Sequence, residues 1–393
     1  MAGIYIHVPF CGSRCIYCDF YSTTQGPEQQ EAYVSALCNE LSAPLPVADA
    51  GTHVSTVYFG GGTPSRLTPA QIGRILRGIG RRFHVAADAE VTLEMNSDDV
   101  EAFFSHQSDI LRKQGGVDSL AVNRISLGVQ TFDDNTLHLL RRRHDAAGAV
   151  QAVRHLQQLG FDNISIDLIY GLPGQSLAQW EHDLDTAFGL GIQHLSAYAL
   201  SYEPGTPLWR MREQGVVRES TEEDTITMYQ RLCQRAQEAG FDHYEISNFA
   251  LPGFHSRHNS SYWHQIPYYG YGPGAHSYDG LATRWANHPS LSAYINYWGN
   301  PVFGDSVAEP PRLIEHLTED ERFDEFVMCG LRIQEGIDLQ RLQEQFGPSR
   351  LSALIASAQP YLRSGNLALH NHYLHLTPQS LMISDAIIRE LMA

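Results

Sequence analysis

Short apolar segments alternate with longer amphipathic segments through the first half of the chain, and this alternation restricts the fold more than any other feature. The apolar segments predict six strands, at residues 4–8, 54–59, 90–95, 124–129, 163–169 and 194–199. Apolar residues spaced three and four apart predict helices between them, at residues 28–41, 69–83, 146–159 and 177–190. Repeated strand–helix units predict an α/β fold with a parallel sheet and right-handed crossovers.

The ends of the predicted strands indicate how this sheet is arranged. Polar or glycine residues occur at or near the carboxyl ends of five successive strands, at residues 60–62, Glu94, Gln130, Asp167 and Tyr198. A β/α barrel brings the carboxyl ends of all its strands to one mouth, whereas a doubly wound sheet concentrates functional residues at one switch point. The distribution therefore favours a partial, TIM-like (β/α)6 barrel.

The second half of the chain does not continue this alternation. Residues 241–278 are rich in glycine and aromatic residues, which predicts loops. From Thr318 a helical, acidic segment precedes two further helices, at residues 339–346 and 351–362. The strand-like sequence LALHNHYLHLT then predicts a small hairpin, so we expect a C-terminal α+β domain of the winged-helix type.

These patterns divide the chain into three predicted regions. The barrel is expected over residues 1–240, an aromatic extension over 241–310, and the C-terminal domain over 311–393. Residues 98–118 fit no regular repeat unit and predict an irregular helix.

The composition excludes several functions and locations. The 393 residues carry a formal net charge of −17, which argues against general binding to nucleic acid because that depends on lysine and arginine. The opening MAGIYIHVPFC lacks the regions of a secretory signal, and no long apolar run predicts a membrane span. We therefore expect a cytoplasmic protein in a reducing compartment, with peripheral contact to a membrane left open.

The most specific motif is a C-x3-C-x2-C run formed by Cys11, Cys15 and Cys18, directly after the first predicted strand. Three closely spaced thiolates can hold three irons of a [4Fe–4S] cluster and leave the fourth iron open for S-adenosylmethionine (SAM). A structural zinc site is the alternative, but it normally needs four ligands, often in two pairs. The other cysteines, Cys38, Cys233 and Cys329, are scattered and predict buried thiols.

A second motif, Gly60-Gly61-Gly62-Thr63-Pro64, follows the second predicted strand. Glycines let the backbone approach a ligand closely, and their amides can meet a carboxylate or an amine. The run lacks the spacing of a dinucleotide-binding fingerprint, so its significance comes from its position one strand after the cysteines.

Several motifs together resemble one known family. The sequences YIHVPFC, GGGTPS, SLGVQTF, LLRRRH and DLIYGLPGQS, with the cysteine run, resemble the HemN/HemW branch of the radical SAM superfamily in matching order. The resemblance extends from Tyr5 into the C-terminal region, which is nearly the whole chain. It implies that Cys11, Cys15 and Cys18 hold a [4Fe–4S] cluster and that SAM binds beside it.

The resemblance also implies a role for individual residues. Tyr5 would pack against the cluster and SAM. The methionyl end of SAM would contact Gly61, Gly62 and Thr63, and the rest of SAM would contact Glu94, Gln130, Arg142 and Asp167. Arg142 is preferred to its neighbours because it stands two residues before His144, although Arg141 replaces a glycine of the family pattern. The family's E-x-N-P pattern also departs here, to Glu94-Met-Asn-Ser97.

Two functions of different classes occur within this branch. One is the oxygen-independent coproporphyrinogen III dehydrogenase, a radical SAM enzyme; the other is a HemW-type heme chaperone, which binds heme and delivers it to acceptor proteins. Phe20 stands where the dehydrogenase pattern has a fourth cysteine. The dehydrogenase also has a long N-terminal arm before its first cysteine, whereas here the first cysteine is residue 11. Both features favour the chaperone. We also expect an electron donor among its partners. A radical SAM methyltransferase or a heme-degrading relative is a third hypothesis.

The sequence His258-Asn-Ser-Ser-Tyr262-Trp263 matches the H-N-x-x-Y-W motif of the chaperones. The radical SAM relatives of the third hypothesis share the cysteine run and the GGGTP motif, so H-N-x-x-Y-W is the motif that distinguishes the chaperones from them. A neutral imidazole is a common axial ligand for heme iron, and large aromatic residues can cover a porphyrin. The resemblance therefore implies a heme site at His258, Tyr262 and Trp263. A hydrogen-bonded structural histidine is the alternative, and His255, His264 and His276 are the other candidate ligands nearby.

Overall fold

A curved sheet forms the centre of the structure, a computed structural model that describes residues 1–46, 52–105, 120–299 and 310–392. Its six parallel strands are β1 (Ala2–Val8), β2 (His53–Gly61), β3 (His84–Asn96), β4 (Arg124–Gln130), β5 (Ile164–Tyr170) and β6 (His194–Ala199). Each pairs in parallel with the next, so their spatial order is their order in the chain. A doubly wound sheet would reverse that order at a switch point. The predicted partial barrel is therefore confirmed.

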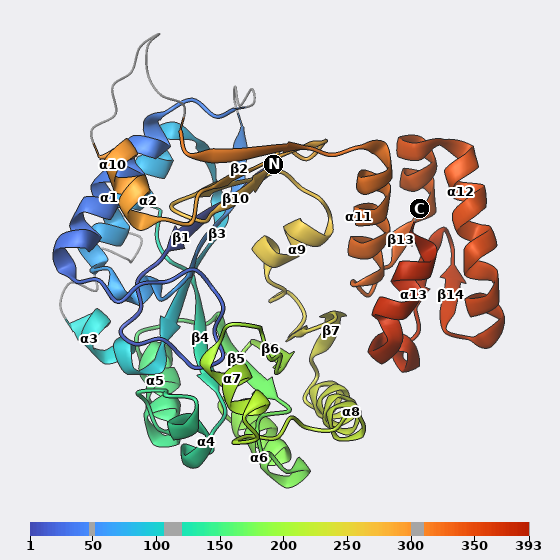
Figure 1. The fold of residues 1–393 in the computed structure, drawn as a ribbon, viewed down its shortest axis with the longest axis horizontal. Helices are drawn as coiled ribbons and strands as arrows, with labels where there is room; N and C mark the ends of the chain where they lie inside the picture. The colour runs from blue at the N-terminus through green and yellow to red at the C-terminus, as the bar shows by residue number, and fades with distance from the viewer. Residues whose placement is uncertain (47–51, 106–119, 300–309, 393) are drawn as a thin grey trace.

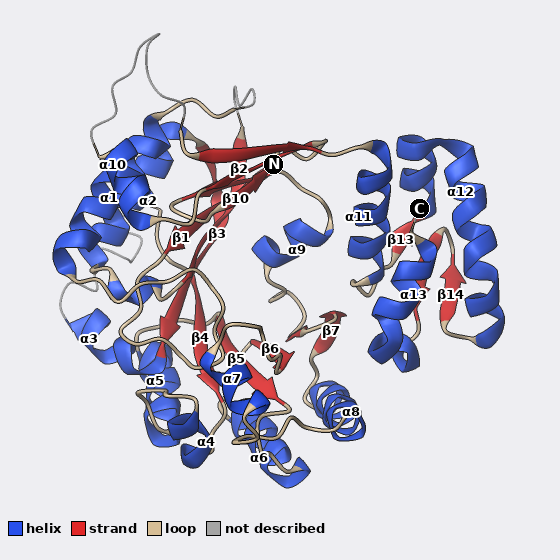
Figure 2. Cartoon of the chain, in the orientation of Figure 1, coloured by secondary structure: helices blue, strands red, loops and turns tan. Residues whose placement is uncertain are grey.

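Helices cover the outer face of the curved sheet, while its inner face looks toward the C-terminal half of the chain (Figures 1 and 2). They are α1 (Pro27–Ser42), α2 (Pro69–Arg82), α3 (Val100–Ser105), α4 (Asp134–Leu139), α5 (Ala146–Gln158) and α6 (Leu177–Gly189). Of the irregular helix predicted at 98–118, α3 is the helical part, and residues 106–118 lie outside the described residues. None of the helices within the described ranges is long and apolar enough to cross a membrane.

Local sequence signals explain where several helices begin. The side chains of Thr68, Ser176 and Thr318 each accept a hydrogen bond from the backbone amide three residues later. The glutamine or glutamate at that later position returns a bond to the cap residue, which completes a capping box. These caps pair backbone groups that would otherwise be left without partners at the helix ends.

The glycine- and aromatic-rich region contains short strands, so the prediction of loops over residues 241–278 is wrong. The elements after β6 are α7 (Pro207–Glu213), α8 (Glu222–Glu238), β7 (Asp242–Glu245), β8 (Asn248–Ala250), α9 (Arg257–Trp263), β9 (Tyr268–Tyr271), β10 (His276–Tyr278), β11 (Thr283–Asn287), α10 (Leu291–Trp298) and β12 (Arg312–His316). Strand β9 joins β1, and β8 joins β6, so the short strands extend both edges of the parallel sheet. Strands this short take their stability from distant partners, which local periodicity does not reveal.

The C-terminal region forms a domain with its own apolar core, beside α9 and β7 (Figure 1). Its elements are α11 (Glu319–Leu331), β13 (Ile337–Asp338), α12 (Leu339–Ser364), β14 (Leu367–His370), β15 (Tyr373–Leu376) and α13 (Ser384–Leu391). Gly347, with φ of 82°, interrupts α12 and divides it into the two predicted helices. The sheet order β13–β15–β14 agrees with the predicted winged-helix type. The limits proposed for the three regions, at 240/241 and 310/311, stay predictions.

A buried carboxylate joins the antiparallel strands to the barrel. Glu40 on α1 accepts hydrogen bonds from the Gly272 amide (3.0 Å), Asn287 Nδ2 (2.7 Å), the Tyr294 hydroxyl (2.5 Å) and Arg312 Nη2 (2.8 Å). These donors come from the loop after β9 and from β11, α10 and β12. The side chains of Glu40 and Arg312 are only 0% and 6% exposed, so water does not solvate this ion pair. The neutral donors around Glu40 supply the hydrogen bonds that water would otherwise make to the carboxylate.

We predict that Glu40→Ala lowers the free energy of unfolding by about 3–5 kcal/mol, because it leaves the Arg312 guanidinium buried without its partner. Urea denaturation of the full chain measures the change. Glu31→Ala is the matched control: its pair with Arg74 is exposed (53% and 37%) and should contribute no more than about 1 kcal/mol. Equal, small losses in the two variants would contradict the prediction.

Candidate cofactor site

The three clustered cysteines lie on the loop between β1 and α1. Backbone hydrogen bonds fix this loop near both of its ends, from Cys11 N to Thr23 O (2.8 Å) and from Thr23 N to Pro9 O (2.6 Å). At its middle, Ile16 is buried against apolar side chains from β5 and from the segments after β4, β5 and β6. These are Leu140, Ile169, Leu172, Tyr202 and Leu208. The loop therefore lies across the mouth of the barrel, where the strands end.

A cavity of about 460 Å3 at this mouth is lined by all three cysteines. Its volume falls within the range of roughly 300–1,000 Å3 that small-molecule sites occupy. Seven of the eight residues predicted to contact SAM also line it: Gly61, Gly62, Thr63, Glu94, Gln130, Arg142 and Asp167. The structure thus brings together residues from β2, β3, β4 and β5 and from the segment after α4.

The cysteine thiols are partly buried and have few polar neighbours. The Thr63 hydroxyl is 3.7 Å from Cys11 Sγ, and Arg142 Nη1 is 3.4 Å from Cys15 Sγ. Burial raises the pKa of the Cys11 thiol, and it raises the pKa of Cys18 to about 11. Iron binds thiolates, so a cluster inserted here would displace these protons.

The glycine run packs directly against the base of the cysteine loop. A Cβ at Gly62 would lie 2.9 Å from the carbonyl oxygens of Val8 and Phe10. The amides are already used: Gly61 N donates to Glu94, Gly62 N to Val8 O (2.9 Å) and Thr63 N to Phe10 O (2.7 Å). The run therefore offers a ligand close approach to the backbone. The sequence suggested that its amides could also bind a carboxylate, but in the structure these amides already have partners.

Two buried carboxylates face the same cavity. Glu94 on β3 accepts a hydrogen bond from the Tyr58 hydroxyl (2.7 Å), and Asp167 on β5 accepts one from the Ser126 hydroxyl (3.3 Å). Burial raises the pKa of Glu94 to about 7, with a smaller rise from the charge of Asp167. Burial likewise raises the pKa of Asp167 to about 6. A bound cation would favour the ionised form of both groups.

Arg142 is placed in the cavity and Arg141 is not. The Arg142 guanidinium donates to Asn96 Oδ1 (2.9 Å) and to Gly128 O (2.7 Å), while its Nε has no hydrogen-bond partner among the described residues. Arg141 is exposed, with a positive φ of 59°. Gln130 also has a positive φ, 75°, at the end of β4, and it is buried in the cavity wall. A non-glycine residue in this conformation is uncommon and typical of functional sites.

Two further cavity residues, Asn96 and Ser126, were missed by the sequence analysis. Asn96 lies two residues after Glu94 on β3, and alternate residues of a strand share a face. Ser126 pairs with Glu94 across β3 and β4 and donates to Asp167. The strand period could have identified Asn96, whereas Ser126 depends on the register between strands.

His258 is a buried, hydrogen-bonded histidine at the start of α9. Its Nδ1 is 2.8 Å from Thr56 Oγ1, and its Nε2 is 2.8 Å from the Tyr262 hydroxyl. The ring stacks on Tyr58, with centroids 5.0 Å apart, and the residue is 1% exposed. Burial lowers the pKa of His258 to about 3, so the ring is neutral. Iron can reach Nε2 only after the Tyr262 hydroxyl moves away.

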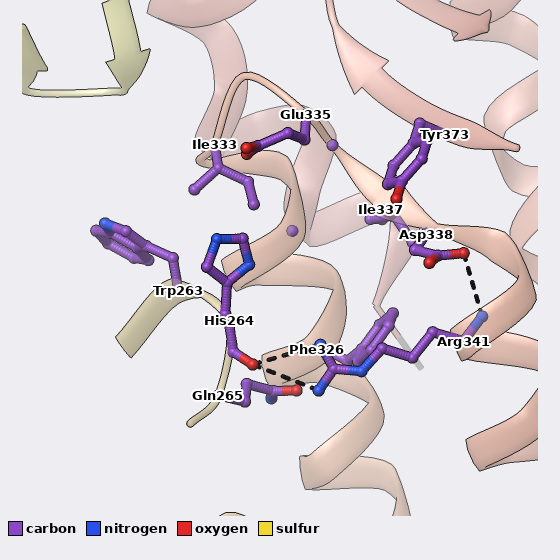
Figure 3. A pocket seen from close by; sticks show the side chains of 12 residues that line it. Trp263, His264, Gln265, Phe326, Ile333, Glu335, Ile337, Asp338, Arg341 and Tyr373 are labelled. Atoms are coloured by element: carbon purple, nitrogen blue, oxygen red, sulfur yellow. Dashed lines mark hydrogen bonds between the residues drawn. The ribbon is translucent and has the colours of Figure 1, made fainter. Parts of the chain in front are cut away.

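The remaining predicted residues lie outside the cofactor cavity. Tyr5 packs near His258 and lines a separate groove with Tyr262. Trp263 instead lines a pocket against the C-terminal domain, beside His264, where Arg341 donates to the His264 carbonyl (3.3 Å) (Figure 3). The predicted heme residues are therefore divided between a buried core position, a groove and a domain interface.

Comparison with known proteins agrees with this geometry. The family model described as the Radical SAM superfamily matches residues 5–187, and the HemN C-terminal domain matches residues 317–383. A solved structure titled "Coproporphyrinogen III oxidase (HemN) from Escherichia coli is a Radical SAM enzyme" covers 100% of this chain and 90% of its own, with a TM-score of 0.80. At 23% identity this likeness shows the fold. The chain is thus a radical SAM superfamily protein with a HemN-type C-terminal domain, and the superfamily implies SAM and a [4Fe–4S] cluster.

Curated relatives narrow the family further. "Heme chaperone HemW" of Bacillus subtilis is 34% identical over 391 residues, 98% of each chain. The protein of the same name in Mycobacterium tuberculosis is 36% identical over 397 residues, 99% of this chain and 94% of the relative. The chain belongs to the HemW family.

We predict that Arg142→Ala weakens SAM binding about ten- to hundredfold, because a charge-assisted hydrogen bond contributes roughly 1.5–3 kcal/mol. Arg141→Ala, the matched control one residue away, should leave SAM affinity unchanged. Equilibrium binding of SAM to the anaerobically reconstituted protein measures both variants. A loss in Arg141→Ala with none in Arg142→Ala would show that the guanidinium in the cavity does not contact SAM.

We also predict that SAM affinity falls as the pH is lowered. The sulfonium charge of SAM does not titrate, but Glu94 becomes neutral below its pKa of about 7, which removes an attractive charge. Affinity should therefore be constant above about pH 8 and roughly tenfold lower at pH 6. Titrations across this range measure the effect, and Glu94→Gln should flatten it. A parent protein whose affinity is independent of pH would contradict the assignment of Glu94.

Proposed function

We propose that this protein is a heme chaperone, which binds heme and delivers it to acceptor hemoproteins. The observation that carries the proposal is the similarity to proteins named heme chaperone HemW over 98% of both chains. Its proposed partners are heme, acceptor hemoproteins and an electron donor. We place the chaperone in the cytoplasm, with peripheral membrane contact left open. The net charge of −17 argues against a nucleic-acid partner.

In this proposal the cavity at the barrel mouth holds the two cofactors. Cys11, Cys15 and Cys18 would hold the [4Fe–4S] cluster, and SAM would bind beside it. The residues proposed to contact SAM are Tyr5, Gly61, Gly62, Thr63, Glu94, Gln130, Arg142 and Asp167. When bound, the cluster supplies the electron that can cleave a carbon–sulfur bond of SAM. Support comes from the single cavity that all of these residues except Tyr5 line.

The residues of the cavity have distinct tasks in this arrangement. The Arg142 guanidinium beside Cys15 Sγ (3.4 Å) offsets the negative charge that thiolate ligands bring. The carboxylates of Glu94 and Asp167 would attract the positive charge of SAM. The Ile16 side chain keeps the cysteine loop seated on apolar residues, so the thiols stay at the mouth.

For heme, the sequence motif proposes contacts at His258, Tyr262 and Trp263. Coordination by His258 requires a rearrangement, because both of its ring nitrogens are hydrogen-bonded. Losing the bond between Nε2 and the Tyr262 hydroxyl costs free energy that iron coordination has to exceed.

Heme binding without porphyrin decarboxylation separates the chaperone from the dehydrogenase. We predict that the anaerobically reconstituted protein binds heme with a defined Soret band and transfers it to an apo-hemoprotein acceptor. The same preparation, given SAM, a reductant and coproporphyrinogen III, should form no protoporphyrinogen. Chromatography of the porphyrins measures turnover. Protoporphyrinogen formation would overturn the chaperone proposal in favour of the enzyme, and failure to bind heme would overturn it outright.

A further inference from the structure

A second, larger hollow lies on the other side of the cysteine loop from the cofactor cavity. It has a volume of about 1,010 Å3 and lies between the cysteine loop and the antiparallel strands β9–β12. We call it the aromatic groove, because its walls carry Phe20, Tyr21, Tyr262 and Tyr268. Its volume is at the upper limit of the usual small-molecule range of roughly 300–1,000 Å3, which is large enough for a macrocycle.

The floor of the groove is set by the register of three strands. His276 on β10 lies directly opposite Ala286 on β11, and Ala286 lies opposite Leu313 on β12. Residues paired in this way present their side chains on the same face of an antiparallel sheet. The small Ala286 leaves a depression between an imidazole and an apolar side chain, and all three residues line the groove.

The groove leaves large apolar surface in contact with water. Phe20 is 64% exposed and Leu313 is 73% exposed, and both line the groove. Large exposed apolar residues that meet at one hollow are a feature of ligand-binding surfaces. A flat, apolar ligand would cover both of them.

His276 differs from the other imidazoles close to it. No hydrogen bond joins its ring to any residue that the structure describes, and it lies exposed in the groove. His7, deeper in the groove, has Nδ1 at 3.2 Å from the Tyr5 hydroxyl and Nε2 at 3.0 Å from Tyr21 O. His258 lies behind Tyr262, also with both nitrogens occupied. The walls of the groove partly shield the ring from water, which lowers the pKa of His276, so the ring is neutral at pH 7 and a nitrogen lone pair is available to a metal.

We propose that the aromatic groove is the site that takes heme, with the His276 imidazole as an axial ligand of the iron. The porphyrin lies against the aromatic and apolar walls, with its carboxylates toward the solvent. This inference rests on the proposed function, and it adds the place and the ligand. It assigns His258 to the packing between α9 and the barrel.

The groove also has a direct structural link to the cofactor cavity. Asp19 and Phe20, the two residues after Cys18, line both hollows. The cysteine loop is therefore the common wall between the groove and the cavity, and heme in the groove lies against the segment that carries the cluster ligands.

The test is a heme titration of the full chain, reconstituted anaerobically, in four forms: the parent, His276→Ala, His258→Ala and His288→Ala. We expect His276→Ala to bind heme about tenfold more weakly with a shifted Soret band, and added imidazole to restore the parent spectrum. His288→Ala is the matched control at the rim of the same groove and should behave like the parent. Iron and sulfide content should be equal in all four forms.

A second variant tests the place of binding without removing a ligand. Ala286→Trp fills the depression beside His276, so it should abolish heme binding while cluster content and SAM binding remain. Parent-like affinity and spectrum in both His276→Ala and Ala286→Trp would overturn the groove assignment and leave the chaperone proposal standing. Loss confined to His258→Ala would also overturn it and assign the ligand to His258. A parent that binds no heme would remove the proposed function itself.

Discussion

The close contact between the glycine run and the end of β1 determines where both hollows form. At Gly62 there is no room for a side chain, because a Cβ would lie 2.9 Å from the backbone oxygens of Val8 and Phe10. The bonds from Gly62 N to Val8 O and from Thr63 N to Phe10 O hold the cysteine loop to the end of β2 at this point. The three thiols and Phe20 all follow on that loop, so a single packing constraint positions the wall between the cavity and the groove.

The cavity carries two kinds of charge. Glu94 and Asp167 are carboxylates whose ionisation is opposed by burial, and a cation is the ligand that relieves this cost. Arg142 lies on the cysteine side, with Nη1 at 3.4 Å from Cys15 Sγ, where thiolates and their cluster would place negative charge. This arrangement suits the pair of cofactors that the radical SAM superfamily implies, a thiolate-bound cluster beside a sulfonium compound.

Much of the barrel could be predicted from sequence because its signals are local. The six parallel strands are buried apolar runs, and strand β6 has the predicted limits, His194–Ala199. Spacing within a single loop or strand end was enough to select the cysteines, Glu94 and Asp167, which the structure gathers at one cavity. The short strands β7–β12 could not be predicted, because their pairing joins residues that are far apart in the chain, such as Gly3 and Tyr268. For the same reason the aromatic groove has no signature in the sequence.

The histidines show why residue type and motif do not determine which imidazole can bind a metal. His258 stands in the motif that resembles the chaperones, but a hydroxyl 202 positions earlier in the chain, on Thr56, occupies one ring nitrogen and Tyr262 occupies the other. The motif that predicted the heme site does not include His276, which pairs with Ala286 across β10 and β11 and lines the groove without a hydrogen bond from its ring to any described residue. Availability of a nitrogen lone pair is a property of tertiary packing, since a hydrogen bond and a metal compete for the same electrons. Only the structure distinguishes a histidine that supports the fold from one that is free to bind iron.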